Sequence, residues 1–373
     1  YLEGFGVEKE IANITENAII TIYNTGVKTS QIMKELDINF LDIRKIDDTT
    51  ILLTPEQYKQ LATKAPYLIA MSVTDLANFS NEEFINSENF KISIPKPKNE
   101  PTIGVIDTMF DKKVYFSDWV QFKNMLDKDI ELDEKDYYHG TAVSSIIVDG
   151  PSLNPNLNDG CGRFRVRHFG VAKHSRFSSF TILRAIKEIV ETNKDIKVWN
   201  LSLGSSMEIN NNFISPEAYI LDKIQYENDV IFVVAGTNKP ANSNIKKIGA
   251  PADSINSLVV NSVKFTNEPT NYSREGLVLS FFNKPDVCYY GGDNKHLITV
   301  YTPSGYKFVA GTSYATPWIS RKLAYLIYII GLSRELAKAL IIDAAADWDD
   351  KLFKPQLIGY GVVPININQI IKS

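Results

Sequence analysis

Cysteine and histidine are scarce in this chain of 373 residues. The two cysteines, Cys161 and Cys288, allow one disulfide at most and exclude a disulfide framework, so free buried thiols are the simpler expectation. None of the four histidines stands in a metal-type spacing with a cysteine, and the Asp-rich loops have no readable ligand spacing. The sequence therefore locates no metal site and indicates no cofactor.

Long apolar runs and long blocks of one charge are also missing. No apolar run reaches the roughly 18 residues of a membrane span, and no signal peptide is visible at the start of this chain. The formal charge is −4, from 40 basic and 44 acidic residues, which gives no reason to propose nucleic acid or an anionic membrane as a partner. A cytoplasmic and a secreted location both stay open.

Residues 1–73 have the pattern of a small α+β domain. Strand-like and helix-like segments follow one another in the order β-α-β-β-α-β, at 18–24, 28–36, 38–46, 49–53, the helix that begins after Thr54, and 67–73. This order is the split βαβ plan of a ferredoxin-like domain. Residues 74–100 are polar and rich in proline at their end, so we expect a linker, or a processing segment, that lies in a groove.

Residues 101–373 have a different pattern, in which short, fully apolar runs alternate with helical stretches. The runs at 102–106, 198–203, 230–236 and 257–263 are candidates for buried strands, and 179–193 and 216–228 for the helices between them. Strands that alternate with helices predict an α/β fold with a doubly wound, mostly parallel sheet.

Three side chains suit nucleophilic catalysis at the carboxyl edge of such a sheet. Asp107 directly follows the first strand, His139 stands at the start of a helix, and Ser313 stands where a buried helix begins. Alone, each has an ordinary explanation as a cap, loop or surface residue. Together they supply a nucleophile, a base and the carboxylate that orients the base.

An attacked carbonyl also needs a donor for its oxyanion. The strand at 230–236 ends in Gly236, Thr237 and Asn238, so the amide of Asn238 is placed to point at Ser313. An asparagine in a turn is the ordinary alternative. The backbone N–H of Ser313 would be the second donor.

With these residues in view, the chain resembles the subtilase family of serine peptidases. The segments GVIDT, HGTAV and GTSYATP are similar to the family's Asp, His and Ser motifs and stand in the family's order. Further similar segments are NLSLG (200–204), KPDVCYYGG (284–292) and GYGVVPI (359–365). The matches are spread over residues 102–373, whereas residues 1–73 resemble the family's propeptide in pattern only.

The resemblance implies a subtilisin-like fold and a serine endopeptidase that works through an acyl-enzyme formed on Ser313. Its partner would be a protein or peptide substrate, bound extended by strand addition along an edge strand at Ser202, Leu203 and Gly204. The N-terminal domain would act as an intramolecular chaperone and inhibitor. Many subtilases carry structural calcium, but no calcium site can be located in this sequence.

Several positions depart from the family's pattern. Met109 stands where the Asp motif has a glycine, Ala142 replaces the second histidine of the His motif, and the loop at 149–162 has no obvious counterpart. The usual Ala-Gly-Asn is interrupted by Thr237, so either Thr237 or Asn238 takes the place of the oxyanion donor, and we favour Asn238 because a hydroxyl replaces an amide poorly.

Other functions and further subsite residues stay open. The departures keep an inactive, peptide-binding scaffold as the alternative, and an esterase would use the same three side chains. The segment 171–179 aligns by order with the opposite rim of the groove, where His174, Arg176 and Phe177 are candidates to line subsites.

Overall fold

The computed structural model describes most of the chain, in nine ranges: 16–39, 43–65, 68–72, 85–86, 93–174, 178–210, 214–240, 243–345 and 355–373. The chain divides into two compact units, Tyr1–Val73 and Thr74–Ser373.

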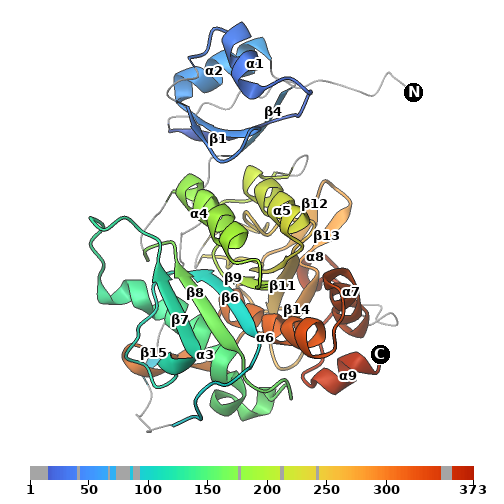
Figure 1. Ribbon diagram of the computed structural model, residues 1–373. Helices are drawn as coiled ribbons and strands as arrows, with labels where there is room; N and C mark the ends of the chain where they lie inside the picture. The colour runs from blue at the N-terminus through green and yellow to red at the C-terminus, as the bar shows by residue number, and fades with distance from the viewer. Residues whose placement is uncertain are drawn as a thin grey trace. The chain divides into compact units, whose positions relative to one another are not determined.

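The first unit contains one antiparallel sheet and two helices (Figure 1). Its elements are β1 (Ala18–Ile22), α1 (Thr29–Glu35), β2 (Arg44–Lys45), β3 (Thr50–Leu53), α2 (Pro55–Lys64) and β4 (Ile69–Ser72). The strand order is β2-β3-β1-β4. The expected start of α2 is confirmed, since Thr54 caps the helix, Pro55 is its first residue, and Thr54 and Gln57 form a capping box.

The second unit is built on a seven-stranded sheet in the order β14-β11-β10-β9-β6-β8-β7 (Figure 1). The strands are β14 (Val287–Tyr290), β11 (Leu258–Val263), β10 (Ile231–Ala235), β9 (Val198–Leu201), β6 (Thr102–Asp107), β8 (Arg165–Gly170) and β7 (Val120–Asn124). Every neighbouring pair is parallel, which confirms the predicted α/β class and parallel sheet.

Helices cover the sheet, and two of them, α3 and α6, pack against each other and carry candidate residues at their starts. The helices are α3 (Tyr138–Leu153), α4 (Ser179–Thr192), α5 (Pro216–Asn228), α6 (Thr312–Ala324), α7 (Arg334–Ala345), α8 (Pro355–Ile358) and α9 (Ile367–Ile371). Every residue of α6 is buried, because it packs against α3 and against β9, β10 and β11. A helix buried on all sides is usually apolar all round, but α6 also buries polar and charged side chains, among them Arg321 and Lys322 near its end.

Two small antiparallel sheets complete the unit. One joins β12 (Gly276–Val278) to β13 (Phe282–Lys284), and the other joins β15 (Ile298–Thr302), β16 (Gly305–Val309) and β5 (Ile85–Asn86). In the second sheet Asn86 is opposite Lys307 and Ile85 is opposite Phe308. Part of the segment 74–100 therefore adds a strand to the hairpin that precedes Ser313.

The segment 149–162 is expected to be a loop, but its residues 149–153 are the end of α3, after a kink at Asp149. The segment is fastened to α6 by a buried ion pair. Arg321 donates to both carboxylate oxygens of Asp159, at 2.7 and 2.9 Å, and to the carbonyl oxygens of Ile147 and Gly162. Both partners of the pair are fully buried. Removing one partner of such a pair leaves an uncompensated buried charge, so the segment is an integral part of the core.

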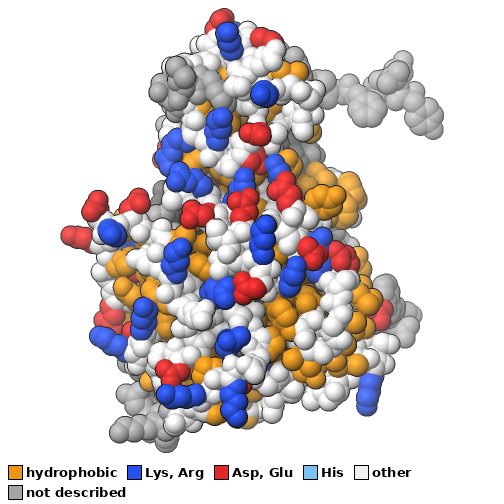
Figure 2. All heavy atoms as spheres, viewed as in Figure 1, with side chains coloured by type: hydrophobic (Ala, Val, Ile, Leu, Met, Phe, Trp, Pro, Cys, Tyr) orange, Lys and Arg blue, Asp and Glu red, His pale blue; other side chains and the backbone are white. Residues whose placement is uncertain are grey.

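Both cysteines are free and buried, as expected, and burial raises the pKa of Cys161 to about 12. Within the described ranges, no helix has the length and apolar content to cross a membrane. On the face drawn in Figure 2, basic and acidic side chains are interspersed, which agrees with the small formal charge of −4.

Candidate active site

Asp107 and His139 are in direct contact at the carboxyl end of β6. The Nδ1 atom of His139 lies 2.5 Å from Oδ1 of Asp107, which also accepts the backbone N–H of Thr108 at 2.7 Å. Both side chains are buried. Because a carboxylate oxygen accepts in this contact, the proton of the hydrogen bond sits on Nδ1, and the second ring nitrogen, Nε2, points away from Asp107.

The start of α3 is fitted closely against the residues that follow Asp107. The N–H of Gly140 donates to Oγ1 of Thr108 at 2.9 Å, and a Cβ on Gly140 would lie 2.7 Å from the carbonyl oxygens of Thr108 and Met109. Only glycine allows this approach, which places His139, the preceding residue, beside Asp107. Ala142 lies one turn further along α3 and is fully buried. An imidazole at this position would be buried away from water, whereas the methyl group of alanine needs no hydrogen-bond partner.

Ser313 is the second residue of α6, and its backbone is tied to Ser202. The hydroxyl of Ser313 donates to the carbonyl of Ser202 at 3.3 Å, and the hydroxyl of Ser202 donates to the carbonyl of Ser313 at 3.2 Å. Pro317 has no N–H to offer that carbonyl, so Ser202 supplies the missing donor. The ring of Tyr314 lies 5.9 Å from the imidazole of His139, so the starts of α6 and α3 are neighbours.

Asn238 and Thr237, the two candidates for the oxyanion donor, point to different places. Oδ1 of Asn238 accepts the N–H and the hydroxyl of Thr312, at 3.0 and 2.9 Å. This orients the amide so that Nδ2 would lie 3.1 Å from a Cβ on Gly311, beside Ser313.

The hydroxyl of Thr237 is used within the protein instead. It donates to the carbonyl of Gly236 and accepts the N–H of Gly249 at 3.0 Å and a guanidinium N–H of Arg274 at 3.1 Å. Thr237 has φ +67°, an uncommon conformation for a β-branched residue. Thr237 thus braces the loop, and the next residue, Asn238, is the one that faces the start of α6.

The substrate strand differs in one respect from the prediction. The sequence predicts an edge strand at Ser202–Gly204, but β9 is an inner strand of the sheet and ends at Leu201, so these residues lie beyond its carboxyl end. Leu203 is fully buried, and a Cβ on Gly204 would lie 2.5 Å from the methyl group of Thr237. The packing of Gly204 against Thr237 therefore explains the glycine without a bound substrate.

Of the three rim candidates, only His174 lies within the described residues. Its backbone N–H donates to Oδ1 of Asp136 at 2.6 Å, and the carbonyl of Asp136 accepts the N–H of Met109. Arg176 and Phe177 fall outside the described residues.

One buried polar residue near the site belongs to none of the sequence motifs. His168, on β8, has both ring nitrogens in hydrogen bonds, to Thr108 and Ser144. The sequence signal is weak: in RVRHFG the inward positions are Val166, His168 and Gly170, so a lone polar residue interrupts the inner face of a strand.

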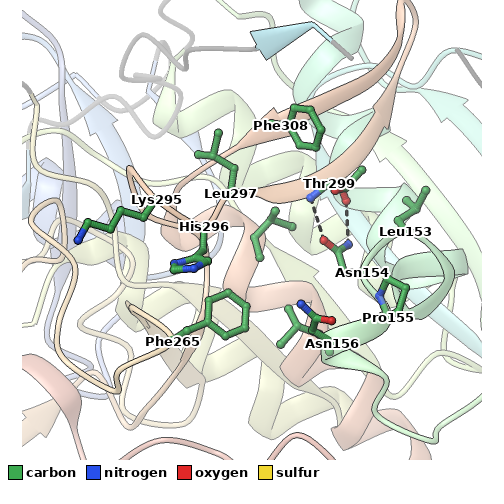
Figure 3. Close-up of a pocket in the computed structure, with 12 residues that line it drawn as sticks. Leu153, Asn154, Pro155, Asn156, Phe265, Lys295, His296, Leu297, Thr299 and Phe308 are labelled. Atoms are coloured by element: carbon green, nitrogen blue, oxygen red, sulfur yellow. Dashed lines mark hydrogen bonds between the residues drawn. The ribbon is translucent and has the colours of Figure 1, made fainter. Parts of the chain in front are cut away.

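A pocket of about 610 Å³ lies away from these residues (Figure 3). Leu153–Leu157, Phe265, Lys295–Thr299 and Phe308 line it. Asn154 and Thr299 bond one another twice across it, at 2.8 Å each. The pocket contains none of the three candidate catalytic side chains. Within the described residues no group of three or more His, Cys, Asp or Glu side chains is arranged to hold a metal.

Comparisons with known proteins bear on the family and the fold. The model of the subtilase family matches residues 15–361. No curated protein matches the chain. Among solved structures, the epidermin leader peptide processing serine protease of Staphylococcus aureus is 17% identical, with a TM-score of 0.61 over 95% of this chain and 97% of that chain.

Two other solved structures are similar over the larger part of the chain. The prenylagaramide maturation protease PagA is 19% identical, with a TM-score of 0.55 over 73% of this chain and 92% of that chain. The patellamide maturation protease PatA is 19% identical, with a TM-score of 0.54 over 73% and 96%. At these identities the likeness shows a shared fold.

Proposed function

The chain belongs to the subtilase family of serine peptidases and is therefore a hydrolase, and from this premise we propose that it is an endopeptidase that cuts peptide bonds through an acyl-enzyme. The observation that carries the proposal is the contact of 2.5 Å between His139 and Asp107, at the start of a helix that packs against the one headed by Ser313. A buried, oriented imidazole with Nε2 as its basic nitrogen is the base that a serine nucleophile needs.

In the proposed mechanism, Ser313 attacks the carbonyl carbon of the scissile bond while His139 Nε2 takes the proton of its hydroxyl. Asp107 holds the imidazole in this tautomer and stabilises the imidazolium that forms. His139 then gives the proton to the leaving amine, and water hydrolyses the ester on Ser313 by the same steps in reverse. In the resting protein the hydroxyl of Ser313 donates to the Ser202 carbonyl at 3.3 Å, and the mechanism requires it to turn from there to His139 Nε2.

The oxyanion of the tetrahedral intermediate would be held by Nδ2 of Asn238 and by the backbone N–H of Ser313. Thr312 already engages Oδ1 of Asn238, so the amide is fixed before the substrate arrives. Such preorganised donors stabilise the charge without reorganising during the reaction.

We propose precursor peptides with leader segments as the substrate class. The support is the fold shared with three peptidases whose names describe leader peptide processing or maturation. Such substrates bind as extended chains, for which the backbone of Ser202–Gly204 beyond β9 offers donors and acceptors.

Active-site labelling together with peptide digestion tests the endopeptidase proposal. The purified protein should react with a fluorophosphonate probe at Ser313 and should cleave members of a peptide library. Both assays are repeated after limited proteolysis of the first unit, in case that unit blocks access. Absence of labelling in both forms would favour the inactive scaffold, and ester turnover without peptide cleavage would favour an esterase.

For the first unit, we propose a ferredoxin-like propeptide domain that acts as intramolecular chaperone and inhibitor. The β-α-β-β-α-β element order and the strand order β2-β3-β1-β4 support the ferredoxin-like part. The boundary after Val73 supports a separate unit followed by a processing segment at 74–100, with 101–373 as the catalytic domain.

Self-processing should cut the chain upstream of Ile85. Because β5 and β16 are antiparallel, the N-terminal direction of β5 is the direction in which β16 leads to Ser313. Residues 85–86 would then occupy the side of the cleft that binds the segment after the cut. Mass spectrometry of the incubated protein should reveal a new N-terminus between residues 74 and 85, and Ser313→Ala should stay intact. A chain that remains intact while fully active would contradict the propeptide assignment.

A further inference from the structure

We propose that His168 is a positioning residue for catalysis, which holds the turn after Asp107 so that Asp107 and His139 keep their geometry. The inference rests on the proposed function. His168 lies on β8, beside β6, and is fully buried behind the Asp107–His139 pair. It does not touch the reacting atoms, so its effect passes through Thr108.

The hydrogen bonds of His168 fix its tautomer. Nε2 lies 2.7 Å from the carbonyl oxygen of Thr108, and a carbonyl only accepts, so Nε2 carries the proton. Nδ1 lies 2.9 Å from the hydroxyl of Ser144 and accepts its hydrogen. Burial lowers the pKa of His168, so the imidazole is neutral near pH 7 and keeps this arrangement.

Thr108 connects His168 to both members of the catalytic pair. Its N–H donates to Oδ1 of Asp107, and its hydroxyl accepts the N–H of Gly140, the residue after His139. Its carbonyl is the group that His168 holds. All three polar groups of Thr108 are thus engaged, and the bond to His168 joins the turn after β6 to the neighbouring strand β8.

The same face of β8 also accommodates the family departure at Met109. A Cβ on Gly170 would lie 2.7 Å from Sδ and from Cε of Met109, so the missing side chain at Gly170 makes room for Met109. His168 and Gly170 are two residues apart and point the same way. Gly170 therefore makes room for the Met109 side chain, and His168 holds the carbonyl of Thr108, the residue before Met109.

A packing role alone does not account for this residue. The rings of Phe110 and Phe122 lie 5.7 and 5.6 Å from the ring of His168, an apolar environment that an aliphatic or aromatic side chain would fill at lower cost. The burial of an imidazole is offset by its two hydrogen bonds, of which the one to the Thr108 carbonyl is the shorter.

The test compares two variants that differ in the donor. His168→Gln keeps an N–H donor near the position of Nε2, whereas His168→Met fills a similar volume without one. In the peptide cleavage assay we expect His168→Met to lower kcat by about 100-fold with KM within about twofold, because a small misplacement of a catalytic group has an effect of this size. His168→Gln should retain kcat within about tenfold of the wild type.

Equal kcat values for the two variants, or a kcat of His168→Met close to the wild-type value, would overturn the inference. If His168→Met does not fold, as judged by thermal unfolding, the decision passes to Ser144→Ala, which removes the hydroxyl that fixes the tautomer. That variant should lower kcat about tenfold at unchanged KM, and an unchanged kcat would overturn the inference. An inactive wild-type protein that takes up no fluorophosphonate would instead refute the proposed function.

Discussion

Replacing Ser313 by alanine should abolish peptide cleavage, with a fall in kcat of about a millionfold, the magnitude established for the serine nucleophile of subtilisin, a member of the same family. The physical reason is that no acyl-enzyme can form without the hydroxyl, while His139 and Asp107 alone only activate water. The measurement is the turnover of a fluorogenic peptide by wild-type and Ser313→Ala protein, with fluorophosphonate uptake as the second readout.

The loss must be separated from unfolding, because α6 is buried and its first turn is tied to Ser202. The hydroxyl of Ser313 makes only a bond of 3.3 Å to the Ser202 carbonyl, so its removal should leave the thermal unfolding temperature nearly unchanged. Ser145→Ala is the control, since it removes a buried hydroxyl from α3 that donates to the Ala142 carbonyl and accepts the N–H of Tyr301. It should retain kcat within a few-fold. Activity of Ser313→Ala near the wild-type level would refute Ser313 as the nucleophile.

The parts of the sheet that are apolar on both faces could be predicted from the sequence, and the others could not. Strands β6, β9, β10 and β11 are inner strands, and their continuous apolar runs follow from burial between two layers of helices. Strand β7 lies at an edge and is partly exposed, and β8 alternates charged and buried residues as RVRHFG. Neither has a continuous run, so the sequence pattern predicts neither.

The candidate site divides in a similar way. Asp107, His139 and Ser313 could be proposed because their motifs stand in a recognisable order along the chain. His168 could not, because its importance depends on which strand lies beside β6 and on a bond to a backbone carbonyl. A hydrogen bond to the main chain leaves no trace in the identity of the accepting residue.

The choice between Thr237 and Asn238 also depends on backbone conformation, and it gives the second large expected effect. The sequence AGTN alone does not decide whether Thr237 or Asn238 turns its side chain toward the oxyanion. With φ +67° at Thr237, its hydroxyl turns to Gly249 and Arg274, and the amide of Asn238 turns to Thr312. Asn238→Ala should therefore lower kcat by roughly 10²- to 10³-fold with little change in KM, a magnitude again known from subtilisin.

Asn238→Asp isolates the donor from the rest of the side chain. It keeps the oxygen that accepts both bonds from Thr312 but has no N–H to offer, so it should lose at least as much kcat as Asn238→Ala. Thr237→Ala should act on stability instead, since the buried N–H groups of Gly249 and Arg274 lose their acceptor, at a cost of about 1–3 kcal/mol. Its kcat should stay within about tenfold of the wild-type value.

The opposite result, with a large loss of kcat in Thr237→Ala and a small one in both Asn238 variants, would assign the oxyanion donor to Thr237. The hydroxyl would then have to leave the N–H of Gly249 in order to reach the oxyanion. Such an exchange takes place during the reaction and gives up a hydrogen bond formed in the resting protein. The amide of Asn238 needs no such exchange, because its oxygen is already held by Thr312 and its nitrogen already faces the start of α6.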